Sequence, residues 1–526
     1  MFTREYQLKK LKETSSFDVV VIGGGASGLG VAVDAASRGL KVALFEAYDF
    51  AKGTSSRSTK LVHGGVRYLA QGNIKLVMEA LKERGLLSKN ANHLFKKQSF
   101  LIPSYSWWHK YFYGIGLIIY DLLSMNLSIG SSKIISKKTA LEMIFTLKSK
   151  NLVGGVTYFD GQFDDARLAL NLAQTAEKLG VTILNYCKVN AFILNDNQKI
   201  NAVTILQKEA NQSITVHCKV VVNATGVFSN KILKLSNQKE KAFKIVPSQG
   251  IHLVLENSFL SGTTALMIPK TSDGRVLFVI PWHGKVVVGT TDTLIKKPLL
   301  EPKPLEEEID FILQNASNYL TKQPTRNDVL SVFSGLRPLV AVEGDKSNTK
   351  EISRGHKIIH SENGLVSIVG GKWTTYRAMS EDVVNDVVAT YGFKVGASKT
   401  ESMPIHGSFM DKNHDSPPEH LWYYGTDAIE LQNFTNTHAS FKQLIHPKYS
   451  FTTGQVIWAI QHEMARNIED ILARRLRLLF LDAKAAIECS EIVGEILKKE
   501  LHKDLTWKDN QVAEFKALAN NYILKI

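Results

Sequence analysis

FDVVVIGGGASGLGVAVDAASRGLKVALFE, residues 17–46, is the stretch that decides the fold. It begins with a short apolar, β-branched run, as a buried parallel strand does, and it closes with a second apolar run that ends in Glu46. Between the two runs, Gly23, Gly25 and Gly28 have the G-x-G-x-x-G spacing, and a helical pattern follows them. This arrangement with a terminal acid is typical of a dinucleotide-binding unit.

Each of these positions has a physical task in such a unit. Gly23 would make the tight turn, and Gly25 would let the backbone approach a pyrophosphate. Gly28 would let the helix, expected over residues 29–38, pack closely against the strand, while the N-terminus of that helix offers N–H groups to phosphates. Glu46 is placed to accept hydrogen bonds from ribose hydroxyls, which disfavours a 2′-phosphorylated ligand such as NADP.

Length and composition predict an ordinary globular protein of two or three domains. The chain has 526 residues, of which 44% are hydrophobic and 22% are charged. Three isolated cysteines argue against a disulfide framework or a zinc site and fit a reducing compartment. The formal charge of +14 indicates a lysine-rich surface or attraction to anionic lipid or an anionic substrate, and no motif supports nucleic-acid binding.

Residues 105–123, YSWWHKYFYGIGLIIYDLL, form an unusual aromatic and apolar segment. It is shorter than the roughly 20 apolar residues that cross a membrane, and it carries His109, Lys110 and Asp121. Tryptophan and tyrosine favour the headgroup boundary. Two interpretations stay open: a helix buried against the domain or a dimer partner, and an interfacial insertion into a membrane surface.

Later segments predict further strands that end in glycine turns. Residues 220–226 (VVVNATG) and 366–371 are such units, and the second leads into a helix expected over 372–389. Strands of a second sheet are expected within residues 250–289. Apolar residues at helical spacing predict a small helical domain over 421–526, with a structural or oligomerising role.

Three dispersed glycine-rich turns around one ligand favour a flavin over a nicotinamide. The Ser/Thr-rich loop at 51–60 is suited to fold over a pyrophosphate, and the turn at 220–226 supplies a second backbone contact. GGKWTTYR, residues 370–377, supplies a third turn and a helix N-terminus, which favours an anionic reduced flavin. The protein would orient this cofactor, which carries the redox chemistry.

The remaining polar residues are suited to a small anion and a proton transfer. Arg67 follows two glycines, Arg337 lies among apolar residues, and Lys372 begins the predicted helix. His63 and His252 are the candidate bases, because histidine titrates close to neutral pH. For each residue taken alone, a structural ion pair or a hydrogen-bonded core histidine is the alternative.

Together these segments resemble the FAD-dependent glycerol-3-phosphate dehydrogenases. The motifs that carry the resemblance include VVIGGGASGLG, GTSSRSTKLVHGGVRYL, DDARL, VVNATG, GIHLVL, VIPWHGKVVVGTTDT, SGLRPLV, GGKWTTYR and the C-terminal ARRLRLLFLDAKAA. One departure is NATGVFSN, residues 223–230, where the family usually has NATGPW.

The resemblance implies an α/β fold with three parts. These are a glutathione-reductase-like FAD-binding Rossmann domain, a mixed-sheet substrate (cap) domain and a C-terminal α-helical domain. The expected boundaries are an N-terminal arm at 1–16, the interleaved FAD-binding and cap domains at 17–395, a linker at 396–409 and the helical domain at 410–526.

The activity that the resemblance implies is oxidation of sn-glycerol 3-phosphate to dihydroxyacetone phosphate, with hydride transfer to FAD and electrons passed to a membrane quinone. The enzyme would be peripheral, on the cytoplasmic side of the inner or plasma membrane. The alternative is a glycerol-3-phosphate oxidase that uses O2 and releases H2O2. No metal is implied, and a homodimer stays open.

Motif by motif, the resemblance also implies roles for individual residues. His63 would accept the substrate proton, His252 is the alternative base, and Arg337 completes the catalytic set. The residues that would surround the substrate or its phosphate are Arg67, Tyr68, His252, Arg337 and Lys372. The residues that would hold FAD are Gly23, Gly25, Gly28, Glu46, Ser55, Ser58, Gly226, Gly371 and Thr374.

Overall fold

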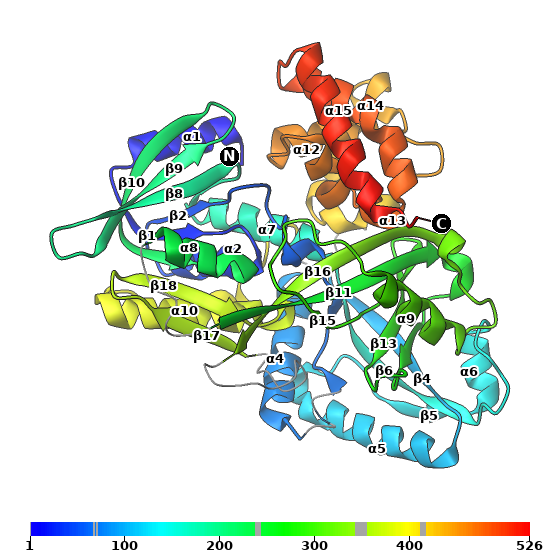
Figure 1. Ribbon diagram of the computed structural model, residues 1–526. Coiled ribbons are helices and arrows are strands. Elements are labelled where there is room, and N and C mark those ends of the chain that lie inside the picture. Colours follow the sequence, from blue (N-terminus) through cyan, green and yellow to red (C-terminus); the bar gives the residue numbers. More distant parts are fainter. Residues whose placement is uncertain are drawn as a thin grey trace.

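The structure, a computed structural model, describes residues 2–66, 69, 72–236, 244–341, 355–410 and 417–525. Figure 1 shows three parts: an N-terminal sheet domain, a second sheet with its own helices, and a C-terminal group of helices that lies against the second sheet. In the described part of the chain, no helix has the length and apolar character needed to cross a membrane.

The first sheet has the order β17-β18-β10-β1-β2-β7, in which all neighbours are parallel except β17 and β18. Its strands are β1 (Phe17–Ile22), β2 (Val42–Phe45), β7 (Thr182–Leu184), β10 (Gln212–Asn223), β17 (His356–His360) and β18 (Leu365–Gly370). The predicted strands around the glycine turn are confirmed. The helix between them, α2 (Ala26–Ser37), begins directly after Gly25, three residues earlier than predicted, because the glycine turn itself forms its first turn.

Both faces of this sheet are covered, which explains the near-continuous apolar run of β1. Val19 and Val21 enter one core with α2, α7 (Asp165–Lys178) and α10 (Tyr376–Tyr391). Val20 and Ile22 enter another core with the ribbon of β8 (Cys187–Leu194) and β9 (Ile200–Gln207). Alternate side chains of a strand point to opposite faces, so an all-apolar strand needs cover on both.

The second sheet is mixed, as predicted, and runs β15-β11-β14-β13-β12-β4-β6-β3, with β16 added beside β11 and β5 beside β6. Only β12 and β4 are parallel neighbours. The strands are β3 (Leu61–Val62), β4 (Lys96–Ser104), β5 (Lys133–Ile135), β6 (Gly154–Gln162), β11 (Lys244–Glu256), β12 (Ala265–Ile268), β13 (Leu277–Trp282), β14 (Lys285–Gly289), β15 (Thr293–Leu294) and β16 (Val329–Ala341). The long pair β11–β16 reaches towards the first sheet (Figure 1).

Helices surround both sheets. On the second sheet these are α4 (Ile74–Asn90), α5 (Trp107–Leu123), α6 (Lys137–Met143) and α9 (Glu306–Ser317), while α8 (Ser229–Leu235) follows β10. The N-terminal helix α1 (Arg4–Glu13) packs near β7, where Arg4 Nη1 donates to the Asn185 carbonyl at 2.6 Å.

The C-terminal part is helical, as predicted. It comprises α11 (Asp427–Asn436), α12 (Thr453–His462), a π-helical turn (Asp470–Arg475), α13 (Leu478–Leu481), α14 (Ala483–Glu500) and α15 (Leu505–Ala519). Its core also includes Val254, Trp282 and Phe333 of the second sheet. The C-terminal helices therefore share a hydrophobic core with the strands that carry candidate site residues.

Candidate functional site

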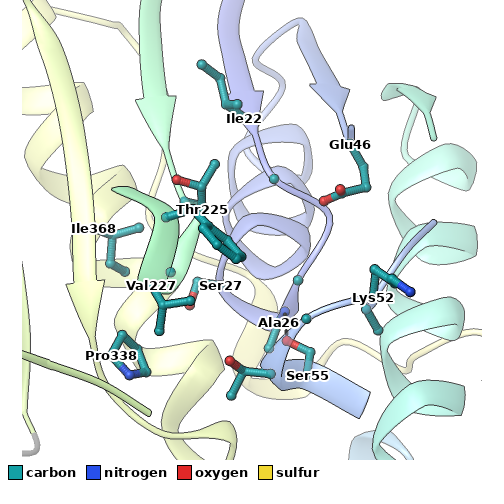
Figure 2. Close-up of a pocket in the computed structure, with 18 of the residues that line it drawn as sticks. Ile22, Ala26, Ser27, Glu46, Lys52, Ser55, Thr225, Val227, Pro338 and Ile368 are labelled. Atoms are coloured by element: carbon teal, nitrogen blue, oxygen red, sulfur yellow. Dashed lines mark hydrogen bonds between the residues drawn. The ribbon is translucent and has the colours of Figure 1, made fainter. Parts of the chain in front are cut away.

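A cavity of about 370 Å³ lies where the chain leaves the carboxyl ends of β1, β2, β10 and β18. This is the edge at which open parallel sheets bind ligands, and the volume is within the usual range for a small-molecule site. Six of the nine predicted cofactor-binding residues line it: Gly23, Gly25, Glu46, Ser55, Gly226 and Gly371. Figure 2 shows Glu46 on one side of this cavity and Pro338 and Ile368 on the other.

The first glycine turn leaves no room for side chains. Gly23 has a φ of +112°, and a Cβ there would lie 2.7 Å from the Ala224 carbonyl oxygen. A Cβ on Gly28 would lie 2.0 Å from the Gly23 carbonyl oxygen, and one on Gly25 would meet the Ser55 hydroxyl at 3.0 Å. The bare backbone next to the cavity is a cradle that a Cβ would fill, which fits a pyrophosphate.

Glu46 is fixed by two backbone donors. Its Oε2 accepts from Gly24 N at 2.6 Å, and its Oε1 accepts from Tyr48 N at 2.9 Å. Burial raises the pKa of this carboxyl above its usual range. At the start of α2, Ala26 N donates to Ser55 Oγ at 2.9 Å. The acid and the helix N-terminus thus border one cavity. Recognition of the ribose and the pyrophosphate of a dinucleotide such as FAD requires this arrangement.

A second cavity, of about 180 Å³, lies against the second sheet. It contains two predicted residues, His63 after β3 and Arg337 on β16. Its other lining residues are Thr59, Gly65, Val66, Tyr158, Asp160, Met267, Arg275, Val276, Phe278, Thr290, Thr291 and Asp292. The cavity contains two arginines, a histidine and two acids, and of these acids Asp160 pairs with Arg84 at 2.8 Å and Asp292 lies 3.5 Å from Arg337. A guanidinium beside a histidine in one small cavity is suited to a small anion.

Arg337 lies opposite Ser248 in the β11–β16 pair. Its Nη1 donates to the Thr291 carbonyl at 3.0 Å, and its Nη2 donates to Thr290 Oγ1 at 3.2 Å. A Cβ on Gly250 would lie 2.5 Å from Arg337 Nη2, so the absent side chain is what lets the guanidinium lie here. The site thereby places a fixed positive fork in the second cavity.

The two candidate histidines have different surroundings. His63 lines the second cavity, and its backbone N donates to Thr374 Oγ1 at 3.4 Å. His252 is buried, stacks on Phe333 with ring centroids 4.8 Å apart, and its Nε2 lies 3.0 Å from Thr59 Oγ1. Burial and the nearby positive charges of Lys60 and Arg337 hold the pKa of His252 well below its usual value. His252 is linked to the second cavity by its contact with Thr59, which lines that cavity.

Other predicted residues lie elsewhere. Lys372 lines the first cavity, not the second. Ser58 is not among the lining residues of either cavity, and its hydroxyl donates to Asp165 Oδ2 at 2.7 Å. Arg67 and Tyr68 lie outside the described residues.

Four residues that no sequence pattern predicted also line the second cavity: Thr59, Arg275, Thr290 and Asp292. Thr59 lies within the quoted motif GTSSRSTKLVHGGVRYL, and Thr290 and Asp292 lie within VVVGTTDT, so the motifs marked their neighbourhood. No pattern in the sequence shows which side chains of these motifs reach the cavity.

Two family models match the chain. The model described as FAD dependent oxidoreductase matches residues 18–377, and the model described as C-terminal domain of alpha-glycerophosphate oxidase matches residues 366–511. The two matches overlap over residues 366–377, where β18 leads into α10.

Relatives are similar over nearly the whole chain. The mitochondrial glycerol-3-phosphate dehydrogenase of Homo sapiens is 38% identical over 97% of this chain and 74% of its own. A mitochondrial glycerol-3-phosphate dehydrogenase of Arabidopsis thaliana is 39% identical over 92% of this chain and 83% of its own. The solved structure of the glycerol-3-phosphate dehydrogenase from Bacillus halodurans, complexed with FAD, is 27% identical and covers both chains fully with a TM-score of 0.80.

Proposed function

Because this chain belongs to the FAD-dependent glycerol-3-phosphate dehydrogenase family, we propose that it oxidises sn-glycerol 3-phosphate to dihydroxyacetone phosphate and passes the electrons to a membrane quinone. The observation that carries this proposal is the pair of neighbouring cavities, one walled by bare backbone and Glu46, the other holding Arg337 and His63. One short segment of chain, residues 52–63, contributes to both.

FAD is the cofactor of this family, and the first cavity is its proposed site. Gly23, Gly25 and the N-terminus of α2 would take the pyrophosphate, and Glu46 would take the ribose. Gly226, Gly371, Ser55, Ser58 and Thr374 complete the proposed set. Ser58 and Thr374 would act by holding backbone, since their hydroxyl oxygens accept from Lys60 N and His63 N. Bound FAD supplies the acceptor for the hydride that leaves the alcohol carbon.

Arg337 would bind the substrate phosphate in the second cavity. Its guanidinium is already oriented by the Thr291 carbonyl and Thr290 hydroxyl, so little side-chain freedom is lost on binding. Arg67 and Tyr68, which lie outside the described residues, stay proposed phosphate ligands, as does Lys372, which lines the first cavity. The requirement for a dianion would exclude plain glycerol.

His63 is the proposed base that takes the hydroxyl proton while the C–H bond breaks. It lines the second cavity, whereas His252 reaches that cavity only through Thr59. The lowered pKa of His252 makes it a weak base, which supports a role in holding Thr59 and the substrate in position. His252 stays the alternative base.

The exposed face of α5 supports peripheral membrane binding. Lys110, Gly114, Leu117 and Tyr120 form its buried side. Its large apolar side chains on the other side are exposed: Trp107, Trp108, Tyr111, Phe112, Ile115, Ile118, Ile119 and Leu122. A continuous apolar surface of this size normally has a partner.

Basic residues next to this helix support an anionic membrane as that partner. Lys133, Lys137 and Lys138 are exposed on the neighbouring β5 and α6, and Figure 1 shows α5 along the outer edge of the second sheet. Tryptophan, aliphatic and lysine side chains together favour an anionic lipid interface. We place the enzyme on the cytoplasmic side of the inner or plasma membrane, where a quinone is within reach.

Anaerobic addition of glycerol 3-phosphate to the purified, FAD-loaded protein tests the substrate. We expect the flavin absorbance to bleach with glycerol 3-phosphate and not with glycerol. A flavin that stays oxidised would overturn the substrate assignment. Reoxidation by a quinone analogue without peroxide supports the dehydrogenase, whereas one H2O2 per substrate and no response to quinone would establish the oxidase.

Co-sedimentation with vesicles that contain anionic phospholipid tests the membrane surface. A Trp108→Glu/Ile115→Glu double variant should lose vesicle binding because it places two charges in the apolar face. Leu505→Glu is the matched control, since Leu505 is an exposed apolar residue on α15. Equal binding of all three proteins would contradict the role of α5.

A further inference from the structure

Residues 52–63 contribute to both cavities, as do the adjacent residues Arg337 and Pro338 of β16. Lys52, Thr54 and Ser55 line the first cavity, and Thr59 and His63 line the second. A shift of this segment therefore moves a cofactor-site wall and the proposed base together. Holding it in place is a requirement for hydride transfer, because reacting groups must be aligned within a fraction of an ångström.

Asp165, at the start of α7, is the centre of the contacts that hold this segment. It is fully buried, and its Oδ2 accepts from Ser58 N at 2.9 Å, from Ser58 Oγ at 2.7 Å and from Lys60 Nζ at 2.7 Å. Its Oδ1 accepts from Arg477 Nη2 at 2.9 Å. One carboxylate thus joins the segment to a side chain that comes from the C-terminal helices.

Arg477 is itself held on several sides. It lies between the π-helical turn and α13, and its Nη1 donates to the Ala473 carbonyl at 3.0 Å within its own domain. Its Nη2 also donates to the Ser56 carbonyl at 2.9 Å. The guanidinium lies 4.5 Å from the Phe480 ring centroid and 5.2 Å from that of Trp282. A planar, anchored guanidinium is a precise connector between the two domains.

The start of the segment is connected to the same helices by a second set of ion pairs. Lys52 pairs with Glu469 of the C-terminal domain and, at 2.6 Å, with Glu301. Glu469 pairs with Arg474 at 2.6 Å, and Arg57 pairs with Glu301 at 2.7 Å. Buried ion pairs of this kind add little net stability compared with apolar packing, but they specify one geometry.

We propose that the C-terminal helical domain is a positioning element of the reaction, in which Arg477 holds residues 52–63 in register with both cavities through Asp165 and the Ser56 carbonyl. This assigns the domain a role in the chemistry beyond structure or oligomerisation. The part of the test below that measures flavin reduction by glycerol 3-phosphate rests on the proposed function. Arg477 is a positioning residue, since it is not one of the described residues that line either cavity.

Hydrogen exchange of the backbone amides in residues 52–63 and anaerobic flavin reduction by glycerol 3-phosphate test the proposal in the full-length, FAD-loaded protein. The variants are Arg477→Gln, Arg477→Lys and Ser58→Ala. Arg466→Gln is the matched control, because Arg466 also belongs to the C-terminal domain but pairs with Glu209, at 2.6 Å. All variants are compared at equal FAD content.

Arg477→Gln should increase exchange in residues 52–63 and slow flavin reduction at saturating substrate by about tenfold to a hundredfold. Arg477→Lys, which keeps a charge beside Asp165, should recover part of the rate. Arg466→Gln should leave the exchange of this segment and the rate unchanged. Unchanged exchange in Arg477→Gln, or a rate equal to that of Arg466→Gln, would overturn the proposal.

Ser58→Ala keeps the test decisive if Arg477→Gln does not fold. It removes the hydroxyl bond to Asp165 and the bond that the Ser58 hydroxyl accepts from Lys60 N, and it keeps the backbone bond to Asp165, so we expect the same changes at smaller size. Wild-type exchange and rate in Ser58→Ala would then overturn the proposal. If the wild-type flavin is not reduced by glycerol 3-phosphate, the proposed function fails, and the exchange measurement still decides whether Arg477 holds the segment.

Discussion

Replacing Gly28 with alanine tests the physical basis of the cofactor site. The new Cβ would lie 2.0 Å from the Gly23 carbonyl oxygen, roughly 1.4 Å short of ordinary contact, and next to the Ala224 side chain. The main obstacle is backbone, so the turn and α2 must separate. Overpacking costs about 1–3 kcal/mol, and we expect the upper part of that range because no flexible side chain can move aside.

The separation would distort the turn that approaches the pyrophosphate. If about 2–3 kcal/mol of this strain falls on the cofactor-bound state, FAD binds roughly 30- to 150-fold more weakly. The assay is a titration of apoprotein with FAD, followed by flavin fluorescence, together with thermal unfolding of the apoprotein to measure effects on the fold itself.

Gly116→Ala is the matched control. Gly116 also lies in a helix, α5, and a Cβ there meets nothing within 4 Å. It should bind FAD as the wild type does and be slightly more stable, since alanine favours helix by about 1 kcal/mol over glycine. A Gly28→Ala protein that binds FAD within about threefold of wild type would refute the packing argument.

Three further predictions concern the second cavity and the interior. Arg337→Lys keeps the charge but loses the fork, so KM for glycerol 3-phosphate should rise about 10- to 100-fold with FAD affinity unchanged, and an unchanged KM in steady-state kinetics would contradict phosphate binding by Arg337. His63→Gln should slow anaerobic flavin reduction at saturating substrate by about 10²- to 10⁴-fold, and the larger loss in His252→Gln instead would make His252 the base. Burial lowers the pKa of His93 to about 4, so the unfolded chain binds more protons than the native one between pH 6.5 and 4, and stability falls by about 3 kcal/mol as the pH falls through that window. His93→Gln should flatten this slope in urea unfolding followed across pH, and a slope equal to that of the wild type would contradict the assignment.

The local sequence was sufficient to predict one wall of the first cavity, because a strand, a turn and a helix adjacent in the chain build that wall. Gly23, Gly25 and Glu46 lie within one unit, and their spacing determines their geometry. The second cavity joins His63 to Arg337, more than 250 positions along the chain, through the mixed sheet. Residue chemistry and the family resemblance suggested that these two residues act together, but no spacing rule predicts that they line one cavity.

The motifs predicted which loops lie near the cavities, but not which of their side chains line them. Ser58 and Thr374 lie beside the cavities, yet each bonds to protein groups, Ser58 to Asp165 and Thr374 to the backbone N of His63. A motif indicates which loop approaches a ligand. The direction of each side chain depends on partners such as Asp165 that lie about a hundred positions away, and no spacing rule within the loop contains them.

The C-terminal arginines show why long-range charge pairing is hidden from the sequence. Arg474, Arg475 and Arg477 lie in ARRLRLLFLD, and a positively charged chain suggests that such residues face solvent. All three are instead at most 3% exposed. Arginine tolerates burial better than lysine because its planar guanidinium is weakly hydrated and binds carboxylates with two donors.

Their partners explain what the burial achieves. Arg475 pairs with Asp49 at 2.6 Å, and Arg477 reaches Asp165, both more than 300 positions earlier in the chain. Each acid lies next to a segment that lines a cavity. The three arginines therefore connect the C-terminal helices to the part of the chain that forms the cavities. Asp49 also pairs with Arg474 at 2.6 Å. Because a buried charge is costly when its partner is missing, substitution of Asp49 alone, which both arginines lose, should be more damaging than substitution of Asp49 and Arg475 together by apolar residues of similar size. An Asp49→Leu/Arg475→Leu protein that unfolds at a lower temperature than Asp49→Leu alone would contradict this account.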